Sequence, residues 1–324
     1  MKFPAYIYLV SVLAAFLTTL LALPFWRRWC LRIGLVDDPG HRKIHARPIP
    51  LAGGFAVMIG LALPLVAGAI LLFLRPPQSH SFELLHYGLG KRAVELGAII
   101  LGAFGMLLLG WVDDKHELSP KAKFAGQFFI ALLVAAAGVR ITLFVPSLVF
   151  SYAITILWIL TVTNAFNFID NMNGLCAGIG CIAASFFALS AAAADQYLVA
   201  ILAFVTAGAL LGFLPYNFPK ASSFLGDAGS HLVGFLLAVL AILPHFYTPN
   251  NQKTLAVLRP LLILTVPLAD LVCVVILRWR LGQPFYIGDN NHFSHRLARL
   301  GWSRVRTVIF IWFLAAVSGC LALL

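Results

Sequence analysis

Long apolar runs recur along almost the whole chain, and they constrain its fold more than any other feature. A transmembrane helix needs about 20 predominantly apolar residues. The chain is 61% hydrophobic and 11% charged, whereas soluble domains are about 45–50% apolar and ~25% charged. We therefore predict one all-α polytopic membrane domain over residues 1–324, with about ten transmembrane helices and a first run that is retained rather than removed as a signal peptide. The predicted spans are 4–25, 51–74, 93–112, 123–139, 143–163, 174–194, 197–214, 228–246, 259–277 and 307–324.

The distribution of charged residues predicts how the chain is oriented. Segments on the cytoplasmic side of a membrane carry an excess of Lys and Arg. Sixteen of the 23 basic residues lie in five segments between alternate runs, which places both termini outside. Eight of the twelve acidic residues lie in the same segments, and topology does not explain them. We infer a polar site on the cytoplasmic face and attribute the net charge of +11 to topology, not to nucleic-acid binding. These inner segments are 26–50, 113–123, 164–173, 215–227 and 278–306.

The run 93–112 ends abruptly at two adjacent carboxylates, Asp113 and Asp114. Carboxylates at the C-terminal end of a helix face the negative end of its dipole, at a cost of up to ~1 kcal/mol each. A chain that tolerates this cost is expected to bind a cation or to handle phosphate at this position. Lys123, in the next run, could reach back toward the carboxylates or a phosphate, or extend to the membrane interface.

Two later inner segments supply oxygen ligands and an aromatic side chain. Asn167, Asp170 and Asn173 recur every three residues, and they are either ligands of the kind that suits Mg²⁺ or residues that cap the helix and form the turn. Asp227 opens the run 228–246 and is either a helix N-cap or a ligand. Phe224 could stack on a base or anchor the loop at the membrane interface.

The first and last inner segments are the basic ones. Lys43 and His45 could contact phosphate, or they could serve as positive-inside anchors or bind lipid headgroups. His292, His295 and Arg296 could bind a transition metal or a pyrophosphate, and the arginine favours pyrophosphate.

Asp270 lies inside the predicted span 259–277, where a carboxylate is costly unless it is paired. Arg278 and Arg280 are both candidate partners, and the sequence leaves the choice open.

Taken together, these segments resemble the polyprenyl-phosphate N-acetylhexosamine-1-phosphate transferase superfamily, of the glycosyltransferase family 4 type. Within it the chain looks most like the undecaprenyl-phosphate N-acetylglucosaminyl 1-phosphate transferase branch. The matching stretches occur in family order over residues 37–297. They are Asp38-Pro39 through Gly54, Asp113-Asp114 with Ser119-Pro120, Lys123 and Gln127, Asn164-x-x-Asn167-x-x-Asp170-x-x-Asn173-Gly174, Phe224-Leu225-Gly226-Asp227-x-Gly229-Ser230, and Asp289-x-x-His292-x-x-His295-Arg296.

The resemblance implies a reaction and a set of partners. A UDP-N-acetylhexosamine would give its sugar 1-phosphate to undecaprenyl phosphate and release UMP, in the inner membrane of a bacterium. The cofactor would be Mg²⁺, with Mn²⁺ as the alternative, and the enzyme would contact membrane lipids and could form a homodimer. A phosphomonoester with a second pKa near ~6 is already dianionic at neutral pH, so we expect direct attack and no aspartyl-phosphate.

The resemblance also implies a role for each site residue. By motif match the catalytic residues are Asp113 and Asp114, and the metal ligands are Asp227 and Asn167. The phosphate-binding residues are Lys123, His292, His295 and Arg296, to which the first loop adds Lys43 and His45, and the nucleotide-binding residues are Asp170, Asn173, Asn217 and Phe224. Two positions depart from the pattern, since many members have Asp at Asn173 and His at Ser294.

Three alternatives stay open at this stage. An enzyme of the same superfamily could use UDP-N-acetylmuramoyl-pentapeptide, although the stretch His45 to Pro50 looks more like the simple-sugar branch. A transporter would need charges at the midplane and paired broken helices, whereas the polar residues here gather at one face. A non-enzymatic membrane scaffold would leave the acidic clustering unexplained.

Overall fold

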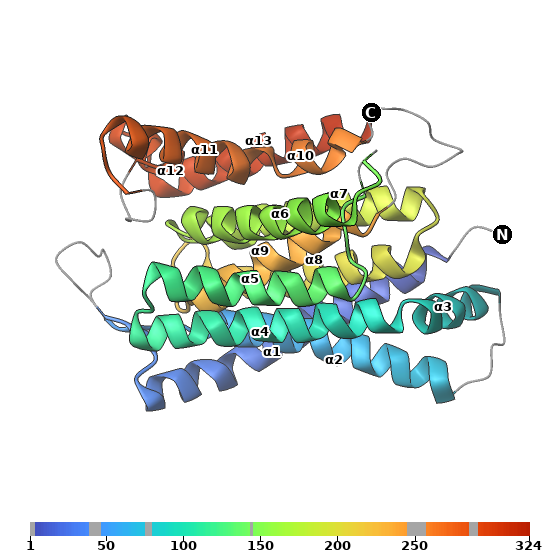
Figure 1. Cartoon of the computed structure of the whole chain (residues 1–324). Helices are drawn as coiled ribbons and strands as arrows, with labels where there is room; N and C mark the ends of the chain where they lie inside the picture. The colour runs from blue at the N-terminus through green and yellow to red at the C-terminus, as the bar shows by residue number, and fades with distance from the viewer. Residues whose placement is uncertain (1–3, 39–46, 75–79, 143–144, 245–256, 285–290) are drawn as a thin grey trace.

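The computed structural model describes residues 4–38, 47–74, 80–142, 145–244, 257–284 and 291–324, and it is almost entirely helical (Figure 1). Two short antiparallel strands, β1 (Val36–Asp37) and β2 (Ile49–Pro50), pair near one end of the bundle. The helices are α1 (Ala5–Ile33), α2 (Gly53–Leu74), α3 (His80–Lys91), α4 (Ala93–His116), α5 (Pro120–Ala136), α6 (Leu148–Ile169), α7 (Leu175–Ala193), α8 (Tyr197–Asn217), α9 (Gly226–Ile242), α10 (Arg259–Ile263), α11 (Thr265–Arg280), α12 (Phe293–Arg299) and α13 (Arg304–Leu323).

The predicted all-α membrane class is confirmed. Among the described residues, seven helices are long and apolar enough to cross a membrane: α1, α2, α4, α6, α7, α8 and α13. The other three predicted spans coincide with α5 and α9, of 17 residues each, and with α10 and α11, which are separated at Leu264. The number of spans and their orientation stay predictions. The sequence did not lead us to expect the amphipathic helix α3.

Helix α9 forms the centre of the bundle, and all but three of its residues are buried. It packs against α4 and α6 through glycines, because small residues allow helices to approach closely inside a membrane. A Cβ at Gly110 would collide with the backbone of Asp227 and Ala228, and one at Gly234 would lie 2.6 Å from Cα of Thr163. These contacts bring the ends of α4 and α6 to the start of α9.

Apolar side chains cover the outside of the bundle, as expected for a surface in contact with lipid. Leu21, Leu74 and Val149 are at least 75% exposed. Figure 1 shows the end of α4, the start of α5, the two strands and α12 at one end of the bundle, with α3 and the C-terminus at the other. Most of the predicted site residues belong to the first of these ends.

Candidate functional site

The ammonium group of Lys123 lies at the centre of the candidate site, among three oxygen atoms from three other helices. Its Nζ is 2.5 Å from Asp113 Oδ2 and 3.0 Å from Asp227 Oδ2. It also donates to Asn167 Oδ1 at 3.5 Å. Lys123 therefore reaches back to the carboxylates and does not extend to the interface. Helix α5 thus supplies the cation, and helices α4, α6 and α9 each supply one residue that contacts it.

Asn167 and Asp227 are held together by direct contact. The Nδ2 group of Asn167 donates to Asp227 Oδ1 at 2.6 Å and to Ser230 Oγ at 2.9 Å. Asp227 is not the N-cap of α9, since that position is occupied by Leu225, which makes no side-chain cap. Its carboxylate lies in the first turn of the helix, where the dipole favours negative charge. Sequence reasoning missed Ser230 as a member of the site, although it lies three residues after Asp227 on the same helix face.

Asp114 binds backbone atoms at the start of α9. Its Oδ1 accepts the N–H of Asp227 at 2.7 Å, and its Oδ2 accepts that of Ala228 at 3.0 Å. Gly226 permits this approach, because its φ is +70° and a Cβ there would lie 2.6 Å from Asp114 Oδ2. The unfavourable end of the α4 dipole is thus offset by the favourable end of another helix. The two adjacent aspartates have different partners: Asp113 pairs with Lys123 and accepts the N–H of Leu118 at 2.9 Å, whereas Asp114 supports Asp227.

Asp170 follows the last residue of α6 and is half-buried. Burial, together with the negative charges of Asp227 and Asp114, raises the pKa of this carboxyl to about 8. Its neutral form is therefore favoured near pH 7 in the protein alone.

The other predicted nucleotide-side residues lie where the α6–α7 turn meets the α8–α9 loop. Asn217 is buried; its Oδ1 accepts the N–H of Gly174 at 2.6 Å, and its Nδ2 donates to Ser223 O at 2.9 Å. Asn173 donates to Pro219 O at 3.3 Å. The backbone N–H of Phe224 donates to Pro50 O at 3.0 Å, and its side chain is half-buried. The side chain of Asn217 thus serves to hold two loops together.

Asp270 pairs with His292, a partner that the sequence did not suggest. The Nδ1 of His292 is 2.7 Å from Asp270 Oδ2, and the N–H of Phe293 donates to Asp270 Oδ1 at 2.7 Å. Arg278 instead lies over the ring of Phe168, 5.1 Å from its centroid. The sequence offered two arginines as candidate partners, and the structure supplies a histidine, because the start of α12 folds back onto α11. The carboxylate orients the imidazole and leaves its Nε2 for a ligand.

The remaining residues of the last inner segment surround this pair. The His295 ring centroid is 6.3 Å from that of His292. Burial and the nearby His292, Arg304 and Arg299 lower the pKa of His295. Arg296 is exposed, and its Nε donates to Asn291 O at 2.9 Å.

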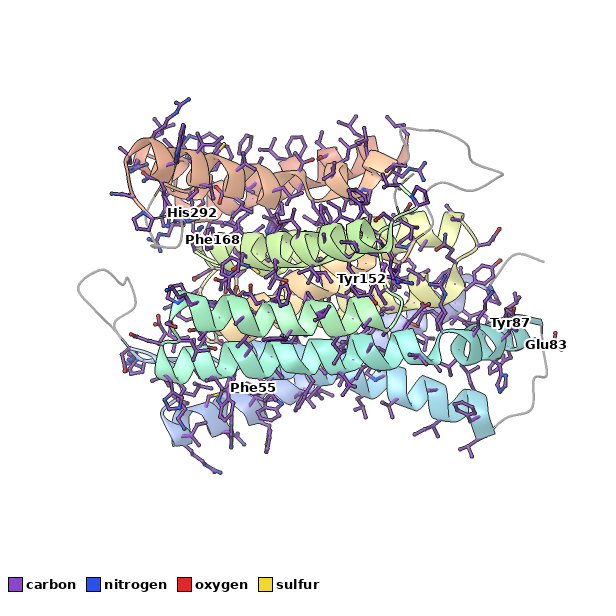
Figure 2. All side chains as sticks on the ribbon, in the orientation of Figure 1. Phe55, Glu83, Tyr87, Tyr152, Phe168 and His292 are labelled. Carbon is purple, nitrogen blue, oxygen red and sulfur yellow. The ribbon has the colours of Figure 1, made fainter. Side chains whose placement is uncertain are left out.

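Two contacts connect this segment to the end of α6 and the turn that follows it. Ser294, which departs from the histidine of many family members, donates to Asn171 Oδ1 at 2.7 Å. The ring of Phe168 packs edge-on against His292, with centroids 6.2 Å apart (Figure 2). We call Lys123 and the three residues around it the Lys123 cluster, and His292 with Asp270, His295 and Arg296 the His292 cluster. Because Asn167 and Phe168 are consecutive, the end of α6 contacts both clusters. The structure therefore brings the second to fifth motifs to one region. Lys43 and His45 lie outside the described residues.

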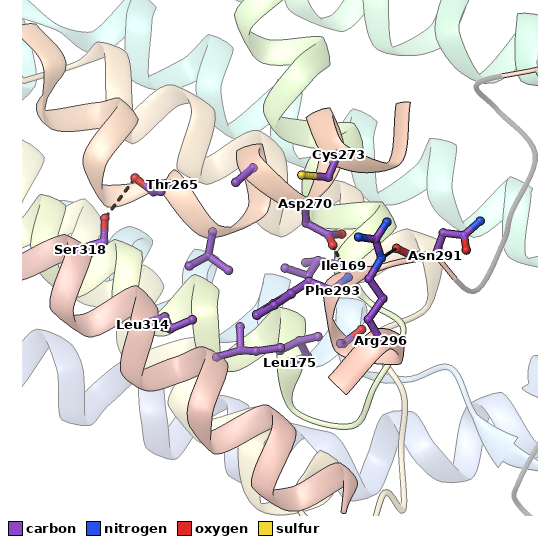
Figure 3. Close-up of a pocket in the computed structure, with 14 residues that line it drawn as sticks. Ile169, Leu175, Thr265, Asp270, Cys273, Asn291, Phe293, Arg296, Leu314 and Ser318 are labelled. Carbon is purple, nitrogen blue, oxygen red and sulfur yellow. Dashed lines mark hydrogen bonds between the residues drawn. The ribbon is translucent and has the colours of Figure 1, made fainter. Parts of the chain in front are cut away.

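A largely apolar cavity of about 370 Å³ opens beside the His292 cluster (Figure 3). Its apolar wall includes Val266 and Leu314 from α11 and α13, and Asp270, Asn291 and Arg296 lie at one end. The cavity thus combines an apolar interior with a polar end near the site. Such a cavity suits an amphipathic ligand with an anionic head and an apolar chain.

Comparison with known proteins finds matches that extend over nearly the full length of the chain. Residues 96–245 match the model of glycosyl transferase family 4. The probable undecaprenyl-phosphate N-acetylglucosaminyl 1-phosphate transferase of Bacillus subtilis is 32% identical, over 97% of this chain and 84% of that protein. The decaprenyl-phosphate N-acetylglucosaminephosphotransferase of Mycobacterium tuberculosis is 33% identical, over 94% and 79%. The undecaprenyl-phosphate alpha-N-acetylglucosaminyl 1-phosphate transferase of Escherichia coli is 26% identical, over 97% and 83%.

Proposed function

The chain belongs to glycosyl transferase family 4, and from this premise we propose that it transfers N-acetylglucosamine 1-phosphate from its UDP-sugar to a polyprenyl phosphate and releases UMP. The observation that carries the proposal is the convergence of Asp113, Asp227 and Asn167 oxygens on one cationic group, beside a cluster of histidines and arginines. Three similar proteins are named for this transfer, and their names supply the sugar and the lipid class. We place the enzyme in the bacterial inner membrane, with this site facing the cytoplasm.

The chemistry of the donor set fits Mg²⁺. The ion binds oxygen ligands and takes one or two carboxylates together with substrate phosphates and water. The position between Asp227 Oδ2 and Asn167 Oδ1 already holds a cation, the Lys123 ammonium, 3.0 and 3.5 Å from these atoms. Asp227 and Asn167 would hold Mg²⁺ or Mn²⁺, and the bound ion would neutralise charge on the diphosphate of the donor. Lys123 would then be the nearest side-chain cation for a phosphate.

The chain's own residues position the two anionic substrates. Asp113 is fixed on both oxygens, by the N–H of Leu118 and by Lys123, and we assign it to positioning or deprotonating the acceptor phosphate. Asp114 aligns Asp227 through the α9 backbone. Phosphoryl transfer depends mainly on such positioning and on neutralising crowded anions. Asp170, Asn173 and Phe224 are assigned to the nucleoside side.

The cavity beside His292 suits the acceptor lipid. Its wall is apolar, as an isoprenoid chain requires, and Arg296 at its polar end can pair with a phosphate. His292, oriented by Asp270, presents Nε2 as a second contact for the same anion. An acceptor bound in this way would have its head near the end of α6, close to Asn167 and the other half of the site.

Purified protein tests the proposal directly. Undecaprenyl phosphate, MgCl₂ and a panel of UDP-sugars are supplied, and UMP release and the mass of the lipid product are measured. We expect product with UDP-N-acetylglucosamine and at least about 100-fold less with Asp227→Asn. Asp195→Asn is the matched control, because Asp195 is exposed and its carboxylate accepts the O–H of Tyr197 at 2.8 Å outside the site.

Three outcomes of this assay discriminate between the readings. Absence of UMP with every donor would refute the transferase reading. Product only with UDP-N-acetylmuramoyl-pentapeptide would move the chain to the other branch. Labelled phosphate trapped on the protein by UDP-sugar alone would contradict direct attack by the acceptor.

A further inference from the structure

His231 is a completely buried histidine whose polar atoms have no partner in the described structure. It lies in α9, four residues after Asp227, and its exposed fraction is 0%. Neither Nδ1 nor Nε2 has a hydrogen-bond partner among the described residues. A neutral imidazole carries one donor and one acceptor, and few buried polar groups in native proteins stay unpaired. Leucine would occupy this apolar interior without that cost, so the imidazole calls for a polar partner.

Thr163 on α6 presents a second buried polar atom of the same kind. Its Oγ1 has no hydrogen-bond partner among the described residues. Two other buried threonines in this bundle donate to the carbonyl four residues earlier, Thr155 at 2.6 Å and Thr206 at 2.8 Å, whereas Thr19 and Thr307 have no partner among the described residues, as Thr163 has none. What distinguishes Thr163 from Thr19 and Thr307 is its position on α6, one helical turn before Asn167.

The two unpartnered groups lie at the same contact between α6 and α9. On one side of His231 along α9, Asp227 accepts the amide of Asn167. On the other side, Gly234 approaches Thr163 so closely that a Cβ would lie 2.6 Å from its Cα. Asn167 and Thr163 are one helical turn apart on α6, so these two contacts bracket His231.

His231 is also coupled to the charges of the site. Asp227 precedes it by one turn of α9, and the Lys123 ammonium lies 3.0 Å from Asp227 Oδ2. No direct hydrogen bond joins the imidazole to either of them in the described structure. A bridging group between the imidazole and the charges would satisfy both observations.

We propose that His231 is a positioning residue of this site, joined through a buried water to the hydroxyl of Thr163 and to the carboxylate of Asp227. Proteins hold ordered water where several buried polar atoms would otherwise stay unsatisfied. Through this water His231 fixes the orientation in which Asp227 receives the divalent cation. The inference rests on the proposed function for the identity of that cation. Residues that orient metal ligands from behind typically change metal affinity by 10–100-fold.

The test measures Mg²⁺ binding separately from catalysis. Thermal unfolding of the purified full chain is recorded in EDTA and across a Mg²⁺ titration, and the concentration giving half of the Mg²⁺-induced rise in Tm is compared. His231→Leu removes both polar atoms and is expected to raise that concentration about 10–100-fold. His231→Gln keeps a donor and an acceptor and is expected to restore a value near that of the wild type. Leu237→Met, a volume-conserving change at another buried α9 position, is the control.

Thr163→Val keeps the shape of Thr163 and removes only the hydroxyl. It is expected to raise the Mg²⁺ requirement in the same direction, and it tests the proposal even if His231→Leu does not fold. An unchanged Mg²⁺ requirement in Thr163→Val and in any His231→Leu protein that folds would overturn the proposal, as would a wild type with no Mg²⁺-induced rise in Tm. A wild type that shows the rise but releases no UMP would refute the transferase function alone.

Discussion

Asp114→Asn tests whether the second aspartate supports α9 and does not itself perform the chemistry. Its two oxygens accept the N–H groups of Asp227 and Ala228 at 2.7 and 3.0 Å. Hydrogen bonds to a charged group are worth about 1.5–3 kcal/mol each, and the favourable helix-terminus charge adds ~0.3–1 kcal/mol. Asparagine keeps one acceptor, turns an N–H donor toward the other amide and removes the charge. We expect a loss of about 2–4 kcal/mol in the free energy of unfolding.

The assay compares Asp114→Asn with Asp113→Asn, since both variants remove one carboxylate from the same turn of α4. Thermal unfolding in detergent with EDTA reports stability, and UMP release reports activity. We expect Asp114→Asn to lower Tm clearly more than Asp113→Asn, because Lys123 keeps Asp227 as a partner when Asp113 is neutralised. Both variants should lose activity. An Asp114→Asn protein that unfolds at the wild-type temperature while losing activity would refute the supporting role and indicate a direct one.

Three further predictions follow from individual contacts. Lys123→Gln removes the cation shared by two carboxylates, so UMP release at saturating Mg²⁺ should fall at least about 100-fold; retention of more than half the activity would contradict its role. In the folded protein the pKa of Asp170 is raised to about 8, so folding favours its neutral form. The stability that this carboxyl contributes is therefore complete below its unfolded pKa and is lost as pH rises through about 8. In EDTA, Asp170→Asn should therefore raise Tm more at pH 8 than at pH 5, and an equal change at both would disprove the shift. Asn217→Ala strands a buried N–H and a buried carbonyl, so the free energy of unfolding should fall by about 2–4 kcal/mol, measured by thermal unfolding against Asn173→Ala.

The class of the fold and the general location of the site could be predicted from the sequence because both depend on local patterns. Runs of apolar residues specify transmembrane helices wherever they occur, since the bilayer imposes one length and one composition. The acidic residues stand out because they interrupt such runs at one face. Asp113, Asn167 and Asp227 could be selected in this way without knowledge of their partners. The amphipathic helix α3 was not foreseen, because it is too short and too polar to read as a span.

Only the tertiary structure decided which of these residues act on one another. Asp114 binds amides 113 and 114 positions away, Lys123 pairs with a carboxylate 104 positions away, and Asp270 meets His292 across 22 positions. Spacing along one helix cannot encode these pairs, because they depend on how closely separate helices approach. Small residues at the contacts determine how closely the helices approach. The need for glycine at Gly110, for example, is evident only from the backbone of α9 packed against it. The sequence by itself determined a membrane-embedded helical enzyme with its polar residues on one face. The packing of α4, α5 and α6 around α9 decided which partner each of these residues contacts.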